Sequence, residues 1–101
     1  MNQLITENLE GIARLCRKHD VVRLDAFGSV LGEEFGDNSD LDFLVVFSRQ
    51  EETNAFHQFF DFKEALSGLL GREVDLICYQ AIKNPIFKQE VEATRQPLYA
   101  A

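Results

Sequence analysis

The chain has 101 residues, 46% apolar and 27% charged, a composition typical of one folded, soluble domain. Ten basic residues against seventeen acidic ones give a formal net charge of −7, which disfavours gripping a nucleic-acid polymer through its phosphates. The two cysteines, Cys16 and Cys78, lack the spacing of metal ligands and are predicted to be buried, reduced thiols. No apolar run approaches membrane-spanning length, and the first residues lack the pattern of a signal peptide. We therefore predict a single cytoplasmic domain, residues 1–101, without membrane contact.

The first half of the chain predicts a helix and two strands. Apolar residues recur at helical spacing over residues 2–19, which predicts an amphipathic helix ending in a basic cluster. Residues 21–27 are rich in β-branched and apolar side chains and predict a strand. A short helix at 29–35 and a polar connection at 36–39 are expected next. Residues 41–47 predict a second strand, and their nearly continuous apolar character indicates that both its faces are covered.

The second half predicts two more helices and one more strand. Residues 54–70 place phenylalanines and leucines on one helical face, and the glycine that follows is a suitable terminator. Residues 73–78 predict a third strand, and an Asn-Pro pair opens a helix over 84–93. Residues 97–101 are expected to form a short tail. This order predicts a small α/β fold, with helices packed on a mixed sheet.

Three aspartates suggest a metal site. Asp40 and Asp42 are two residues apart at a strand, so they project to the same face and can share cations. If the pair is considered alone, it is equally well explained by Asp40 as a turn residue and Asp42 as a solvent-facing residue. Asp75, in the middle of the next strand along the chain, could lie beside the pair. Three carboxylates can hold two Mg²⁺ ions about 4 Å apart, and one of the carboxylates can also accept a proton.

Gly28 and Ser29 are the candidate phosphate ligands. A glycine at a strand end lets the backbone approach a phosphate, and the N-terminus of a following helix offers free N–H groups. A lone Gly-Ser pair is more often a turn and a helix cap. Its position between a predicted strand and a predicted helix, ahead of the aspartate strand, favours the phosphate interpretation.

Together these residues form the pattern Gly28-Ser29-x10-Asp40-x-Asp42 with Asp75 downstream, which resembles the minimal nucleotidyltransferase (MNT) family of the DNA polymerase β superfamily. The resemblance extends over nearly the whole chain and is marked at residues 27–31, 38–45, 71–76 and 98–100.

The resemblance implies a polymerase-β-like nucleotidyltransferase fold, with a mixed sheet and flanking helices, and transfer of AMP from ATP. It implies that Gly28 and Ser29 bind the phosphates. It also implies that Asp40, Asp42 and Asp75 are catalytic and hold Mg²⁺, two ions in all, with Asp75 doubling as the base. Members of the family often act as antitoxins that adenylylate a tyrosine on an all-helical HEPN-domain toxin, so a HEPN toxin is the partner that the resemblance implies.

Two other functions are compatible with the sequence. The segment after Ser29 is acidic at Glu33 and Glu34, where many relatives of the family carry a basic residue. A catalytically weak or inactive nucleotide-binding antitoxin that neutralises its partner by direct contact is therefore an alternative. Transfer to a small molecule ranks last, because a chain of this size has no separate recognition domain.

Overall fold

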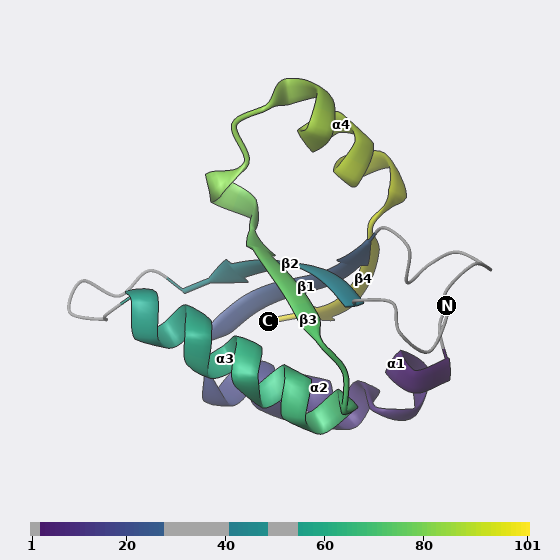
Figure 1. Ribbon diagram of the computed structural model, residues 1–101, viewed down its shortest axis with the longest axis vertical. Coiled ribbons are helices and arrows are strands. Elements are labelled where there is room, and N and C mark those ends of the chain that lie inside the picture. The colour runs from purple at the N-terminus through teal and green to yellow at the C-terminus, as the bar shows by residue number, and fades with distance from the viewer. Residues whose placement is uncertain (1–2, 28–40, 49–54) are drawn as a thin grey trace.

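A four-stranded mixed sheet organises the chain (Figure 1). The strand order is β3-β2-β1-β4. Strand β1 (Val21–Phe27) pairs antiparallel with β2 (Leu41–Phe47) and with β4 (Gln96–Ala100), whereas β2 pairs parallel with β3 (Val74–Cys78). The bounds of β1 and β2 are those predicted from the sequence. The computed structural model describes residues 3–27, 41–48 and 55–101, so the predicted helix at 29–35 and the connection at 36–39 lie outside the described residues.

Helices lie on both faces of the sheet (Figure 1). Helices α1 (Gln3–Glu7), α2 (Leu9–Lys18) and α3 (Ala55–Leu70) cover one face, hereafter the α2–α3 face, and α4 (Pro85–Thr94) lies over the other, hereafter the α4 face. Helix α3 is the crossover that parallel pairing of β2 with β3 requires. The predicted α/β fold is confirmed. None of the helices in the described part of the chain is both long and apolar enough to span a membrane.

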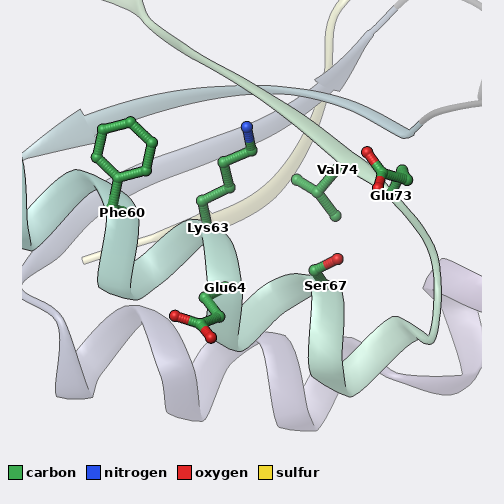
Figure 2. A pocket seen from close by; sticks show the side chains of 6 residues that line it. All are labelled: Phe60, Lys63, Glu64, Ser67, Glu73 and Val74. Carbon is green, nitrogen blue, oxygen red and sulfur yellow. The ribbon is translucent and has the colours of Figure 1, made fainter.

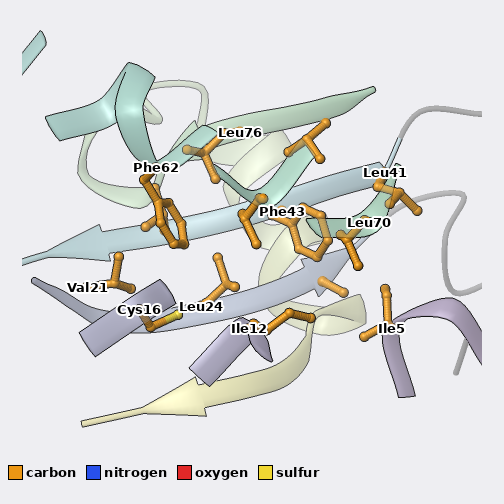
Figure 3. Close-up of a cluster of buried hydrophobic side chains, with 14 residues drawn as sticks. Ile5, Ile12, Cys16, Val21, Leu24, Leu41, Phe43, Phe62, Leu70 and Leu76 are labelled. Carbon is orange, nitrogen blue, oxygen red and sulfur yellow. The ribbon is translucent and has the colours of Figure 1, made fainter. Parts of the chain in front are cut away.

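The main core lies between the sheet and the helices of the α2–α3 face (Figure 3). Alternate residues of β2 and β3 enter it, among them Phe43 and Leu76, and β1 contributes Leu24. Phe43 and Phe62 are the largest side chains there without exposed surface. A smaller cluster on the α4 face joins residues of β1, β2 and α4, namely Phe27, Leu44 and Val91. Coverage of β2 on both faces, expected from its apolar sequence, is confirmed.

Two parts of the chain differ from the sequence prediction. The single helix expected at 2–19 is divided into α1 and α2 at Asn8, whose side-chain amide donates to the Leu4 carbonyl at 2.8 Å. Asparagine competes for backbone hydrogen bonds in this way and interrupts helices. The tail expected at 97–101 is strand β4, which pairs with β1 and covers an edge that would otherwise expose unpaired backbone groups.

The predicted helix ends and one of the predicted buried cysteines are confirmed. Gly71 follows α3 with φ +66, a conformation that suits glycine. Asn84 caps α4 by accepting hydrogen bonds from the backbone N–H groups of Ile86 at 2.9 Å and Phe87 at 3.2 Å. Cys16 is buried, and burial raises its pKa to about 12. Cys78 is only half-buried, so the expectation of full burial was wrong for that residue.

Candidate functional site

Asp42 and Asp75 lie side by side on the parallel strands β2 and β3. The register places Asp75 opposite Asp42, and on the other side of β2 it places Phe27 of β1 opposite Asp42. Phe27, Asp42 and Asp75 therefore form a row across three strands, at the end of β1 where the chain continues into Gly28 and Ser29. The expectation that a neighbouring strand brings Asp75 next to Asp42 is confirmed.

This carboxylate pair, Asp42 with Asp75, points toward the α4 face. Successive side chains of a strand alternate between faces, and neighbours of the pair on both strands, Phe43 and Leu76 among them, enter the core on the α2–α3 face. Asp42 is half-buried and Asp75 is exposed. The two carboxylates are thus held on regular strands and remain accessible to a ligand from solvent.

The carboxylate pair fits a hard divalent cation. Like charges on directly opposite residues of paired strands repel each other, and a cation between them removes that cost. Mg²⁺ prefers carboxylate oxygens and keeps water or phosphate as further ligands, for which the exposed position of Asp75 leaves room. Within residues 3–27, 41–48 and 55–101, no three His, Cys, Asp or Glu side chains converge as a metal site. The remaining predicted site residues, Gly28, Ser29 and Asp40, lie outside the described residues.

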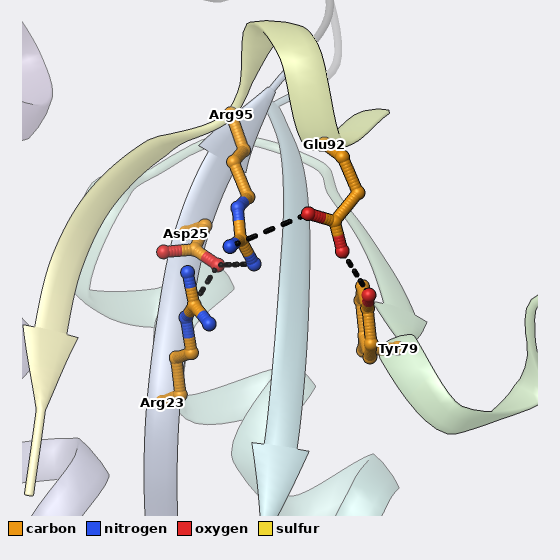
Figure 4. Close-up of polar contacts among 5 residues, drawn as sticks. All are labelled: Arg23, Asp25, Tyr79, Glu92 and Arg95. Atoms are coloured by element: carbon orange, nitrogen blue, oxygen red, sulfur yellow. Dashed lines mark hydrogen bonds and ion pairs between the residues drawn. The ribbon is translucent and has the colours of Figure 1, made fainter. Parts of the chain in front are cut away.

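A polar network connects α4 to the sheet on the face of the carboxylate pair (Figure 4). At its centre is Asp25 of β1, which is only 2% exposed. Its Oδ2 atom pairs with Arg23 Nε at 3.1 Å and with Arg95 Nη1 at 3.6 Å. Arg95 Nη2 also pairs with Glu92 at 3.6 Å, and Glu92 accepts a hydrogen bond from the Tyr79 hydroxyl. These contacts join β1, α4 and the short 3-10 helix Tyr79–Ala81 that follows β3.

The network supplements a small apolar contact. Val91 is the buried residue of α4 and packs with Phe27 and Leu44. The Oδ2 atom of Asp25 is paired with Arg23 and Arg95, whereas its buried Oδ1 atom has no hydrogen-bond partner in the described part of the chain. Loss of an arginine would therefore leave a poorly compensated buried charge, which is costly.

Sequence reasoning identified the carboxylate pair but missed this network. Asp25 was visible as a charge that interrupts an apolar strand, and such a charge requires a partner if it is buried. Its partner Arg95 lies far along the chain, between α4 and the strand β4 that the sequence did not predict, so no local pattern could connect the two residues.

The hydrogen bond between Tyr79 and Glu92 shifts the pKa of both groups. It raises the pKa of Tyr79 above its ordinary 10.0, because the phenol must keep its proton to donate. It lowers the pKa of Glu92 below its ordinary 4.5, because the bond stabilises the carboxylate. Both groups are therefore in the states that form the bond at neutral pH.

A cavity of about 340 Å³ lies between α3 and the start of β3 (Figure 2). Its lining includes Phe60, Lys63, Ser67 and Val74. Because Val74 and the adjacent Asp75 point to opposite faces of the sheet, this cavity lies on the α2–α3 face. It is therefore on the face opposite to the carboxylate pair.

Sequence comparison shows the family. The family model described as Polymerase beta, Nucleotidyltransferase matches residues 10–101, and the chain belongs to this family of nucleotidyltransferases. A candidate protein adenylyltransferase of Methanocaldococcus jannaschii is 41% identical over 78 residues, which are 77% of this chain and 76% of that protein. Protein adenylyltransferase MntA of Thermococcus cleftensis is 33% identical over 93 residues, which are 87% of this chain and 91% of MntA.

Solved structures share the fold. A candidate minimal nucleotidyltransferase superimposes with a TM-score of 0.78 at 34% identity, and the match covers 97% of each chain. A structure of a tri-AMPylated Shewanella oneidensis HEPN toxin in complex with an MNT antitoxin contains a chain that matches with a TM-score of 0.66 at 19% identity, covering 95% of this chain and 72% of that one. The predicted polymerase-β-like fold is confirmed.

The substitution Arg95→Ala should lower the free energy of unfolding by about 1–3 kcal/mol, because it leaves buried Asp25 with one arginine partner and removes the ion pair between the end of α4 and β1. Urea denaturation followed by circular dichroism measures this. Arg14→Ala, at an exposed position of α2, is the matched control and should change stability by less than about 0.5 kcal/mol. Equal stabilities of the two variants would contradict the role assigned to the network.

The substitution Glu92→Gln should lower the pKa of Tyr79 toward 10.0. Because the pKa of Glu92 is lowered in the folded protein, the bond contributes its full stability at pH values above the ordinary pKa of Glu92. This contribution is lost as the pH falls through the lowered pKa of Glu92. Because the pKa of Tyr79 is raised in the folded protein, the bond likewise contributes its full stability at pH values below the ordinary pKa of Tyr79. This contribution is lost as the pH rises through the raised pKa of Tyr79. Tyrosinate absorbance, recorded in a Tyr99→Phe background that leaves Tyr79 as the only tyrosine, measures the pKa. A Tyr79 pKa that does not respond to Glu92→Gln would show that the bond is absent in solution.

Proposed function

We propose that this protein transfers AMP from ATP to a tyrosine of a HEPN-domain toxin and acts as the antitoxin of that toxin. In this proposal residues 1–101 work as one nucleotidyltransferase domain. The observation that carries it is the placement of Asp42 opposite Asp75 on paired strands, next to Phe27 at the end of β1. Family membership supports nucleotidyl transfer. The relative named protein adenylyltransferase MntA supports adenylylation of a protein, and the shared fold of the chain solved with an AMPylated HEPN toxin agrees with such a partner.

The proposed site divides the substrate between two sets of residues. Gly28 and Ser29, which directly follow β1, contact the phosphates of ATP. Asp40, Asp42 and Asp75 hold Mg²⁺. When bound, the two Mg²⁺ ions neutralise the triphosphate and the leaving pyrophosphate and lower the pKa of the attacking hydroxyl.

The proposed reaction is an in-line displacement at the α-phosphorus of ATP. The phenol oxygen of the acceptor tyrosine forms a bond to this phosphorus. The bond from the phosphorus to the oxygen that bridges the α- and β-phosphates breaks, and pyrophosphate leaves with that oxygen. The phenol proton passes to the carboxylate of Asp75, the more exposed member of the pair.

The position of Asp75 agrees with an acceptor that comes from another protein. Strand β3 is at one edge of the sheet, with β2 as its neighbour on the inner side. A tyrosine of a partner can therefore approach the carboxylate pair from beyond this edge.

The proposal predicts label transfer that depends on the carboxylate pair. Incubation with Mg²⁺, ATP labelled at the α-phosphate and a HEPN-domain protein from the same genome should label that protein. Asp42→Asn and Asp75→Asn should each reduce the rate by at least about 100-fold, because each removes a metal ligand or the base. Replacement of the partner's tyrosines by phenylalanine, one at a time, identifies the acceptor.

Glu64→Gln is the control, because Glu64 is an exposed carboxylate on α3, away from the α4 face. It should transfer label at the unchanged rate. Undiminished transfer by folded Asp42→Asn and Asp75→Asn would contradict the proposal. So would the absence of label on a HEPN protein that binds the chain tightly.

A further inference from the structure

A cavity of about 480 Å³ lies between α4 and the end of β1. The described residues that line it are mostly apolar, and they include Phe27, Phe87, Glu90, Val91, Ala93 and Thr94. Cavities of about 300–1,000 Å³ with apolar and aromatic walls and a few polar groups are typical of small-molecule sites. Size and lining therefore suit a flat, largely apolar ligand group.

Two phenylalanine rings form the aromatic part of this wall. The rings of Phe27 and Phe87 meet nearly edge to face, with centroids 6.3 Å apart and an interplanar angle of 74°. Phe27 is anchored in the small core of the α4 face, whereas Phe87 is 36% exposed. The ring of Phe87 is thus not enclosed in the core and has surface available for another ring.

The cavity adjoins the carboxylate pair. Phe27, which lines it, is directly opposite Asp42 in the register of β1 and β2, and such residues have Cα atoms about 5 Å apart. Their side chains share the α4 face, because directly opposite residues of paired strands point the same way. A ligand with phosphates at the carboxylate pair therefore has an aromatic cavity within reach of its other end.

We propose that this cavity holds the nucleobase of the triphosphate substrate, stacked on the ring of Phe87. The inference rests on the proposed function and deepens it by assigning the part of the substrate that the carboxylates do not contact. A base has flat apolar faces that an aromatic ring stabilises, and an edge bearing polar groups. Glu90 supplies a carboxylate at the lining that can accept a hydrogen bond from an exocyclic amine of the base.

The test separates binding of the base from binding of the phosphates. The probes are adenosine 5′-(β,γ-imido)triphosphate and inorganic tripolyphosphate, each titrated with Mg²⁺ into the full chain by calorimetry. Phe87→Ala should raise the Kd of the nucleotide by at least about 5-fold and leave that of tripolyphosphate within about twofold. Phe87→Tyr retains a ring and should restore nucleotide binding, whereas Phe87→Leu, which retains apolar bulk without a ring, should not.

Ile86→Ala is the matched control. Ile86 is adjacent in α4 and 70% exposed, and it is not part of the described lining. This variant should bind both probes as the unchanged chain does. Circular dichroism establishes that each variant is folded. If Phe87→Ala does not fold, the comparison of Phe87→Leu with Phe87→Tyr keeps the test decisive, because only the ring differs between loss and retention of nucleotide binding.

Three results would overturn the inference. Unchanged nucleotide binding in folded Phe87→Ala and Phe87→Leu would refute the cavity as the base site. If Phe87→Ala weakened the binding of both probes equally, the substitution would disturb the whole site and Phe87 would not bind the base specifically. If, in either case, Asp75→Asn still abolishes tripolyphosphate binding, the proposed function stands and only the base site is wrong. Failure of the unchanged chain to bind either probe would refute both.

Discussion

The parallel pairing of β2 with β3 determines which side chains meet at the candidate site. Asp42 and Asp75 are in register, so both point toward the α4 face. A shift of one residue would turn Asp75 into the core and Leu76 out of it, because side chains alternate along a strand. The apolar residues of β3 that enter the core on the α2–α3 face thus fix the register and, with it, the approach of the two carboxylates.

The α4 face is built differently from the α2–α3 face. On the α2–α3 face, three helices bury a large apolar core. On the α4 face, one helix attaches through a small apolar cluster and through ion pairs to buried Asp25. Polar contacts therefore help to position a helix that lines the aromatic cavity. A site on the α4 face therefore has accessible polar groups and a cavity. Most of the buried apolar side chains lie in the core on the opposite face.

Much of the fold was predictable from the sequence, since β1, β2, α3 and α4 have strong periodic or capping signals. Strand β4 was missed because its five residues include a proline and no clear alternation, and its strand character depends on pairing with β1. The break at Asn8 was missed because a single side-chain hydrogen bond decides it. Asp42 and Asp75 were identified from their strands, whereas the contact between Asp25 and Arg95 depends on tertiary structure alone. The family resemblance, read from motif spacing, is confirmed.

In the proposed function, Asp42 and Asp75 jointly hold a divalent cation at a nucleoside triphosphate. A crystal structure with Mn²⁺ in place of Mg²⁺ and a non-hydrolysable ATP analogue tests it most directly, because anomalous scattering locates manganese independently of the protein density. We expect a manganese ion within about 2.3 Å of an oxygen of each of the two carboxylates and of a phosphate oxygen. A bound nucleotide whose manganese contacts neither Asp42 nor Asp75 would contradict the claim.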